Sequence, residues 1–254
     1  MRSRLAMTFT SYTHTISSAE IRAVLGLGFS VQSSSAPAEQ FINSHFPNFD
    51  LFPLLETVDT VLAALTKTTI SREVILTDGP MPKMEILFYS SDYNDENIGL
   101  VMWRTFTVEI QGIIVDHDFF RIPRAARGKG VFKKILRAFF QQYVNIGAGK
   151  IRVHAALEDG GLAWAKLGFR AIDKAEVDEI LRKAGAILAP AQFNLVRLPY
   201  DRYYSQNPAG QAFPIIRWAE MSFMEPILKQ SNWHGVVDLT NPQEFSNFVV
   251  NAFE

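Results

Sequence analysis

The spacing of hydrophobic and polar residues changes along the chain, and each spacing predicts a different kind of element. Apolar side chains recur at helical intervals between residues 54 and 65, at Leu54, Leu55, Val58, Val61, Leu62 and Leu65. Segments 72–78, 83–90, 98–110 and 112–123 are then β-rich and joined by short links, which favours antiparallel pairing. The period becomes helical again over Val131–Tyr143, where apolar residues share one face and basic residues lie away from it.

The segments that follow predict a strand–helix–strand unit and a mostly helical end. Segment 150–157 is a strand expected to run parallel to segment 112–123, because such units are normally parallel and right-handed. A short helix stopped at Gly168 and a strand over 169–173 come next. We further expect a helix over 175–184, a strand over 193–199, a helix interrupted at Pro226, and a last helix with Asn241 as N-cap. Before residue 54, Ser17 and Glu20 suggest a capping box, and 30–40 reads as a loop.

Composition and charge narrow the class of protein. Hydrophobic residues make up 48% of the 254 residues and charged residues 20%, as in ordinary globular proteins. The net charge of −1 argues against general attraction to nucleic acid or anionic membranes. The chain has no cysteine, which excludes disulfides, thiolate nucleophiles and cysteine-ligated metals. No apolar run reaches the length of a signal peptide or a membrane span, so we expect a cytoplasmic protein without membrane partners.

Positive charge gathers where the strand 112–123 leads into the helix Val131–Tyr143. Residues 119–157 contain nine lysines and arginines and no acidic residue. A helix N-terminus offers free N–H groups and about half a positive charge, so it attracts phosphate. Gly128 and Gly130 allow the backbone to approach such a group closely. The turn is therefore suited to a pyrophosphate, although it has the spacing of neither a P-loop nor a dinucleotide fingerprint.

The turn carries a family resemblance. Arg127-Gly128-Lys129-Gly130-Val131-Phe132 resembles the Gln/Arg-x-x-Gly-x-Gly/Ala motif of the GNAT superfamily of acyl-CoA-dependent N-acetyltransferases. The segment "LAWAKLGF" resembles the Leu-Tyr-x-x-Leu-Gly-Phe box of that family, and the match spans residues 113–172.

The resemblance implies a fold and a cofactor site. The fold would be a mixed α/β, three-layer domain with splayed central parallel strands. Acetyl-CoA would be the co-substrate, held by Arg127, Gly128, Lys129, Gly130, Val131 and Phe132, with the backbone of Ile122 polarising the thioester carbonyl. We accordingly divide the chain into an N-terminal helical segment (1–70), an acyl-CoA-binding core (71–174) and a mostly helical C-terminal extension (175–254). No metal is expected.

Two residues depart from the family pattern. Phe132 replaces the last small residue of the motif, and its side chain has to turn into the core. Trp164 stands where many members have a tyrosine that protonates the departing thiolate, and an indole cannot do so. Water or another residue has to act, or no acid is needed.

Three side chains are candidates for the general base. The strand pattern places Asp116, Asp118, Phe120 and Ile122 on one face, with His117 on the other. Some family members carry a carboxylate base on this strand, and the motif alignment lands on Asp116. Asp118 and His154 are further candidates. The alternative interpretation is that Asp116 and Asp118 are ordinary strand-end or surface carboxylates, and no ligand spacing supports a metal among these residues.

Three functions stay open at this point. The first is a transferase that moves an acetyl group from acetyl-CoA to an amine acceptor, either a small molecule or a protein. The second is a GNAT-fold binding module without catalysis. The third is a nucleic-acid- or tRNA-directed protein that uses the basic stretch 119–157. The salt dependence of binding distinguishes the third function from the other two, because binding to many phosphates weakens steeply with ionic strength.

Overall fold

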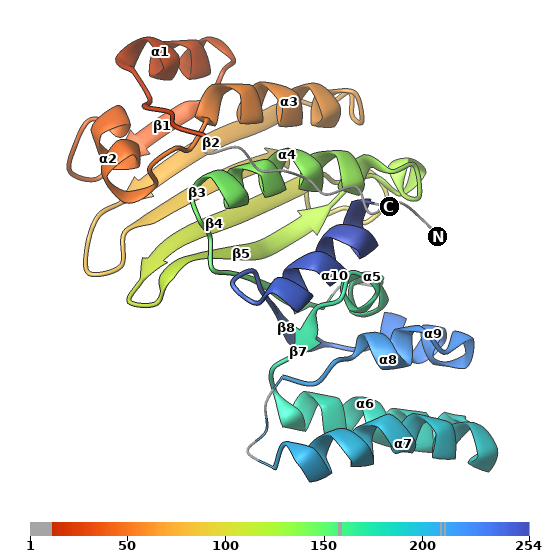
Figure 1. Cartoon of the computed structure of the whole chain (residues 1–254). Coiled ribbons are helices and arrows are strands. Elements are labelled where there is room, and N and C mark those ends of the chain that lie inside the picture. Colours follow the sequence, from red (N-terminus) through yellow and green to blue (C-terminus); the bar gives the residue numbers. More distant parts are fainter. Residues whose placement is uncertain (1–11, 157–158, 209, 211, 254) are drawn as a thin grey trace, which may run out of the picture.

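The structure, a computed structural model, describes residues 12–156, 159–208, 210 and 212–253 (Figure 1). Within these residues the chain forms one mixed sheet flanked by helices. The longer helices are α1 (Ser18–Gly26), α2 (Ala38–His45), α3 (Leu51–Ala63), α4 (Val131–Asn145), α6 (Lys174–Ile187), α7 (Pro190–Gln206) and α10 (Pro242–Phe253). The shorter ones are α5 (Gly160–Lys166), α8 (Ile216–Ala219), α9 (Glu225–Lys229) and the 3₁₀ turns η1 (Arg124–Ala126) and η2 (Ser222–Met224).

The described strands make an eight-stranded sheet in the order β1-β2-β3-β4-β5-β6-β8-β7. They are β1 (Ser30–Ser33), β2 (Ile70–Thr77), β3 (Lys83–Ser90), β4 (Val101–Glu109), β5 (Gly112–Arg121), β6 (Lys150–Ala155), β7 (Arg170–Ala171) and β8 (Trp233–Asp238). Strands β2 to β5 are antiparallel neighbours, as predicted. Strand β6 pairs with β5 in parallel across α4, which confirms the strand–helix–strand unit. Leu157, at the end of the strand expected over 150–157, lies outside the described residues.

The helices α1, α3 and α4 cover one face of the sheet (Figure 1). The core between them is aromatic: Phe106 on β4 contacts Phe139 and Tyr143 on α4, with ring centroids 6.4 and 5.8 Å apart. The opposite face at β3 and β4 is open, and Trp103 is 37% exposed there. Near the other end of the sheet, Glu176 on α6 accepts hydrogen bonds from the backbone and ring of His234. The single mixed sheet with its flanking helices confirms the predicted mixed α/β class.

Several predictions near the two ends of the chain are wrong. Segment 193–199 is the middle of α7 rather than a strand. The expected loop 30–40 contains β1 and the start of α2. The segment Trp233–Asp238, for which no strand was predicted, is β8 and lies between β6 and β7. The capping of α1 by Ser17 and of α10 by Asn241 is confirmed, since each side chain accepts a backbone N–H of its helix. The other half of the predicted capping box is not formed, because the Glu20 carboxylate contacts His14 and the backbone N–H of Phe52 instead.

A bulge in β5 changes which side chains face the helices. Trp103 pairs with Phe119 and Thr105 pairs with Asp116, so two steps along β4 correspond to three along β5. The strict alternation predicted for β5 is therefore wrong beyond Asp118. Phe120 lies on the helix side together with His117, because its ring contacts Phe132 on α4 at 5.2 Å.

Candidate functional site

The glycine turn between β5 and α4 has the backbone that the sequence pattern requires. Gly128 and Gly130 have φ of 74° and 75°, in the left-handed region that other residues adopt at a cost. Gly130 is the N-cap of α4, and no side chain caps the helix there. A Cβ added at either glycine would meet nothing within 4 Å, so the backbone is open on that side. No acidic residue stands in the first turn of the helix, which leaves its positive end unneutralised.

Strands β5 and β6 stop pairing before either strand ends. The last parallel partners are His117 and Val153, whereas β5 continues to Arg121 and β6 to Ala155. Beyond this point each strand pairs only on its far side, β5 with β4 and β6 with β8. The chain thus opens a gap in the middle of the sheet, next to the glycine turn.

A pocket of about 700 Å³ lies at the ends of these two strands. Its lining comes from η1 and the residue after it, from the residue after β6, from the N-cap of α5, and from the end of α9 with the loop that follows: Arg124, Arg127, Ala156, Asp159, Lys229, Gln230, Ser231 and Asn232. Three of the lining residues are basic and one is acidic, so the pocket suits an anionic ligand. Arg127 is also held in place, because its guanidinium donates to the carbonyl of Glu96.

Phe132 and Trp164, the two departures from the family motif, belong to one aromatic cluster. Phe132 turns toward the core and contacts Phe120 and Trp164, with ring centroids 5.2 and 5.3 Å apart. Trp164 also contacts His117 at 5.4 Å and Phe169 at 5.2 Å. These rings lie beside the point where β5 and β6 separate. The large side chain at position 132 therefore packs inward, as the sequence requires, and leaves the outer side of the turn open.

The carboxylates of β5 have different surroundings. Asp116 accepts two hydrogen bonds from Arg152, at 2.7 and 2.8 Å, and Arg152 also pairs with Glu109. Among the residues that the structure describes, Asp118 forms no such ion pair, although the charge of the buried Arg104 acts on it. Partial burial, opposed by a hydrogen bond with Thr105, raises the pKa of the Asp118 carboxyl above its usual value. The residue is nevertheless exposed by surface area, so we expect this upward shift to be small.

Both carboxylates line a second pocket, of about 350 Å³, on the open face of the sheet. Its other lining residues are Met81, Lys83, Glu85, Trp103, Thr105, Thr107, Glu109 and Arg152. Four carboxylates against two basic residues give this lining a formal charge of −2, which suits a cationic ligand.

His154 is separated from the aspartates by its own contacts. Its Nε2 lies 2.6 Å from the side-chain oxygen of Asn232, and its ring stacks on His234 at 4.2 Å. The structure thus brings Asp116 and Asp118 together, whereas His154 belongs to a cross-strand pair of histidines on β6 and β8.

A buried cation near the bulge was not predicted from the sequence. Arg104 is 1% exposed and donates to the carbonyl oxygens of Trp103 and Phe119 at 2.8 and 3.1 Å. Burial lowers the pKa of Arg104. Burial also lowers the pKa of His117 well below its ordinary value. The Nε2 atom of His117 lies 2.9 Å from the Tyr143 hydroxyl. The signal was present in the alternation Met102–Arg104–Phe106, which places the arginine among core residues.

Models of known protein families, curated proteins and solved structures were each compared with this chain, and none of the three comparisons found a match. Among the residues that the structure describes, no helix combines the length and the apolar character needed to cross a membrane.

Proposed function

We propose that the chain is an acyl-CoA-dependent N-acyltransferase that moves an acetyl group from acetyl-CoA to an amine. The observation that carries the proposal is the separation of β5 from β6 beyond His117 and Val153, which lies next to a glycine turn and a pocket with basic residues. A pyrophosphate at the start of α4 would be stabilised by the helix N-terminus and by Arg124 in the adjoining pocket. Lys229, on the other side of that pocket, already pairs with Glu225 and Asp159. The proposal keeps the cytoplasmic location expected from the sequence.

The reaction needs a neutral amine and a polarised thioester. The amine nitrogen attacks the carbonyl carbon, the C–S bond breaks, and the sulfur leaves as a thiolate while the nitrogen loses a proton. Backbone N–H groups near Ile122 are the candidates for polarising the carbonyl oxygen, as the family resemblance implies. Trp164 cannot protonate the thiolate, so we assign that proton to water.

Asp118 is the better candidate for the base among the three predicted residues. Asp116 is held in a two-bond ion pair with Arg152, which competes for its lone pairs. His154 already contacts Asn232 and His234. Asp118 lines the open-face pocket and, among the described residues, forms no ion pair with a lysine or arginine, so its lone pairs stay available to a proton. Burial also shifts its pKa upward rather than downward. The acceptor amine would then approach from the open face of the sheet.

Binding of acetyl-CoA tests the cofactor site. We expect acetyl-CoA to raise the melting temperature of the protein and Gly130→Asp to abolish the rise, because it puts a like charge beside the pyrophosphate. The matched control is Gly147→Asp at the other end of α4. Gly147 also has positive φ, 65°, and open space around its missing Cβ, so backbone strain and added charge are similar there.

The control variant should keep the thermal shift relative to its own ligand-free protein. If Gly130→Asp keeps the shift as well, the turn is not the phosphate site and the proposal fails. A shift without acyl transfer to any amine would favour the binding module that has lost catalysis.

A further inference from the structure

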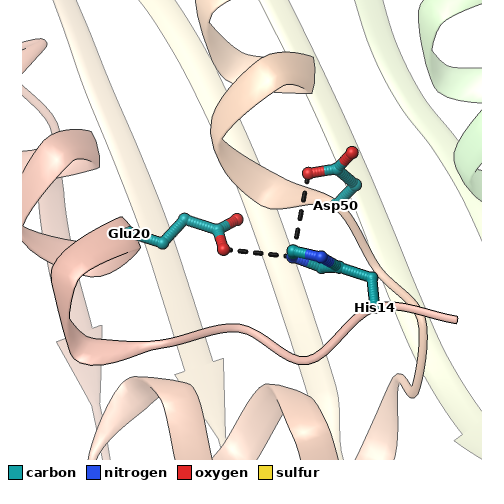
Figure 2. Close-up of side chains that lie close together, drawn as sticks. All are labelled: His14, Glu20 and Asp50. Carbon is teal, nitrogen blue, oxygen red and sulfur yellow. Dashed lines mark hydrogen bonds and ion pairs between the residues drawn. The ribbon is translucent and has the colours of Figure 1, made fainter.

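Three side chains that no part of the proposed function uses converge near the start of the described chain. They are His14, Glu20 on α1 and Asp50 just before α3 (Figure 2). The Nε2 atom of His14 lies 3.0 Å from Oε2 of Glu20 and 3.8 Å from Oδ1 of Asp50. All three ligand atoms lie within 4.8 Å of one another. From these contacts we propose that His14, Glu20 and Asp50 bind a divalent transition metal, of which Zn²⁺ is the best fit.

The distances suit a zinc ion. Zinc bonds to nitrogen and oxygen of about 2.1 Å at tetrahedral angles place neighbouring ligand atoms about 3.4 Å apart. The separations of 3.0 and 3.8 Å lie on either side of this value. One imidazole and two carboxylates supply three ligands, which leaves a fourth position for water. Calcium and magnesium prefer oxygen-only sites with more ligands, so they fit less well.

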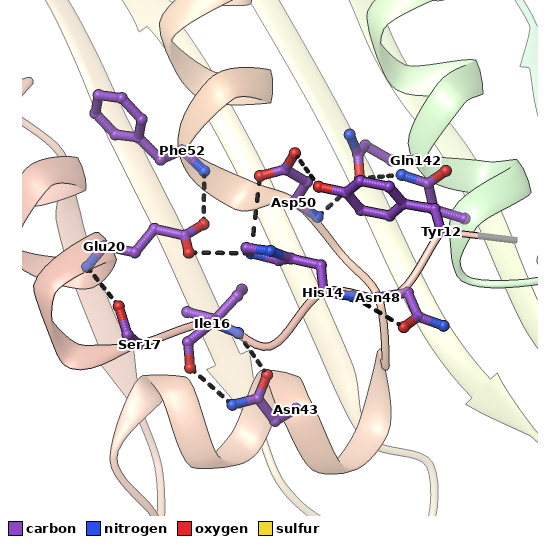
Figure 3. A network of polar contacts seen from close by, with 11 residues as sticks. Tyr12, His14, Ile16, Ser17, Glu20, Asn43, Asn48, Asp50, Phe52 and Gln142 are labelled. Carbon is purple, nitrogen blue, oxygen red and sulfur yellow. Dashed lines mark hydrogen bonds and ion pairs between the residues drawn. The ribbon is translucent and has the colours of Figure 1, made fainter. Parts of the chain in front are cut away.

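The far oxygen of each carboxylate is held by a second contact, and the backbone of His14 is held as well (Figure 3). Oε1 of Glu20 accepts the backbone N–H of Phe52, and Oδ2 of Asp50 accepts the hydroxyl of Tyr12 at 2.6 Å. The backbone N–H of His14 donates to Asn48. These contacts leave Oε2, Oδ1 and Nε2 directed toward one another, and outer contacts of this kind orient the ligands of metal sites.

The charge balance also favours a cation. Glu20 and Asp50 carry two negative charges, and His14 supplies at most one positive charge. The side chains of His14, Glu20 and Asp50 are only 24%, 15% and 21% exposed. Within the described part of the chain, no lysine or arginine forms an ion pair with either carboxylate.

A metal here would join the segment containing His14 to α1 and to the start of α3. The neighbouring bond from Gln142 to the backbone N–H of Asp50 extends the connection to α4. We assign the metal a structural role because it would link these segments, and this role is independent of the proposed acyl transfer.

Zinc titration of the chelator-treated full chain tests the site. At free Zn²⁺ about 100 times the dissociation constant, we expect the melting temperature to rise by about 5–10 °C, with one zinc per chain. Mg²⁺ should give no comparable rise. The variants His14→Gln, Glu20→Gln and Asp50→Asn keep the size of each side chain and weaken its metal bond, so each should reduce the rise. The control is His45→Gln, because His45 lies 4.0 Å from Asp78 with no second carboxylate in the pair.

X-ray absorption of the zinc-loaded protein gives a second measurement that does not depend on the variants. It should detect imidazole and oxygen ligands around one zinc. The proposal is overturned if the native protein retains no zinc, or if the three variants keep the full thermal shift. In the first case the three side chains are a hydrogen-bonded contact alone, and in the second the zinc binds elsewhere.

Discussion

At the scale of single residues, the surroundings of Asp116 and Asp118 favour a different carboxylate from the motif alignment, which selected Asp116. Both lie on β5 and both line the open-face pocket. Of these two carboxylates, only Asp116 forms hydrogen bonds with Arg152 on the adjacent strand β6. The one-residue bulge between the partners of Trp103 and Thr105 interrupts the regular pairing just where Asp118 stands. Local pairing, rather than residue type, therefore makes Asp118 the stronger candidate for the base.

Asp118→Asn should keep acetyl-CoA binding and lose about 10²–10⁴-fold in the rate of acyl transfer, because asparagine cannot take the proton at neutral pH. In the native protein the rate should fall as the pH is lowered and Asp118 becomes protonated. The raised pKa of Asp118 places this fall at a higher pH than for an ordinary aspartate. Single-turnover rates across pH measure both effects.

Asp116→Asn and His154→Gln are the matched controls for this experiment. A loss confined to one of them would move the role there. Native rates in all three variants would mean that orientation and carbonyl polarisation supply the catalysis without a base from these residues.

At the scale of elements, two adjacent glycines at the start of α5 have opposite constraints. A Cβ on Gly161 would lie 2.0 Å from the carbonyl oxygen of Leu228, in the backbone of α9. A Cβ on Gly160 would meet only ordinary contacts, the nearest at 3.5 Å. Close approach of α5 to α9 therefore depends on Gly161, and it fixes the loop of residues 229–232 that lines the larger pocket.

Gly161→Ala should destabilise the protein by about 1–3 kcal/mol, because the backbone of α9 has to move away. Gly160→Ala should be neutral or stabilising by up to about 1 kcal/mol, since alanine restricts the unfolded chain. Urea unfolding of the two variants measures the difference. Equal stabilities would show that α5 and α9 are not packed as closely as described.

The sequence predicted the elements whose partners are close along the chain. Strands β2 to β5 and helix α4 have strong periodicity and short links, so local pattern was sufficient for them. Strand β8 was missed because its six residues include Gly235 and pair with β6, about eighty positions earlier. Helix α7 was read partly as a strand because only Val196 is buried along it and Pro199 lies inside it, so its helical periodicity is weak.

The candidate site likewise has one part that local sequence predicts and other parts that depend on long-range packing. The glycine turn was predictable, because positive φ at Gly128 and Gly130 follows from residue type and spacing. The ion pair of Asp116 with Arg152 depends on the register of β5 against β6, and the cluster of His14, Glu20 and Asp50 depends on how three separate segments pack. Neither leaves a signal in a single stretch of sequence.

At the scale of the whole molecule, the nine basic residues of segment 119–157 do not form one surface. Arg124 and Arg127 line the larger pocket. Arg152 lies on the open face of the sheet in ion pairs with Glu109 and Asp116. Arg137, on α4, lies over the ring of Phe253 on α10. This distribution gives a small ligand two or three cations at one place, whereas a nucleic-acid backbone would need a continuous row.

The dependence of binding on salt should therefore separate the two kinds of ligand. Acetyl-CoA is a small ligand without the condensed counterions of a nucleic acid, so its binding should weaken only modestly between 50 and 200 mM salt. Binding through six to ten contacts to nucleic acid would weaken by about 10³–10⁵-fold over that range. Titration calorimetry with acetyl-CoA, and fluorescence anisotropy with a labelled RNA duplex, give the two slopes. Arg124→Gln should weaken acetyl-CoA binding, whereas Arg137→Gln, which removes the guanidinium over Phe253, should leave it unchanged. Tighter binding of the duplex than of acetyl-CoA, with a slope steeper than about −5, would instead assign the basic segment to nucleic acid.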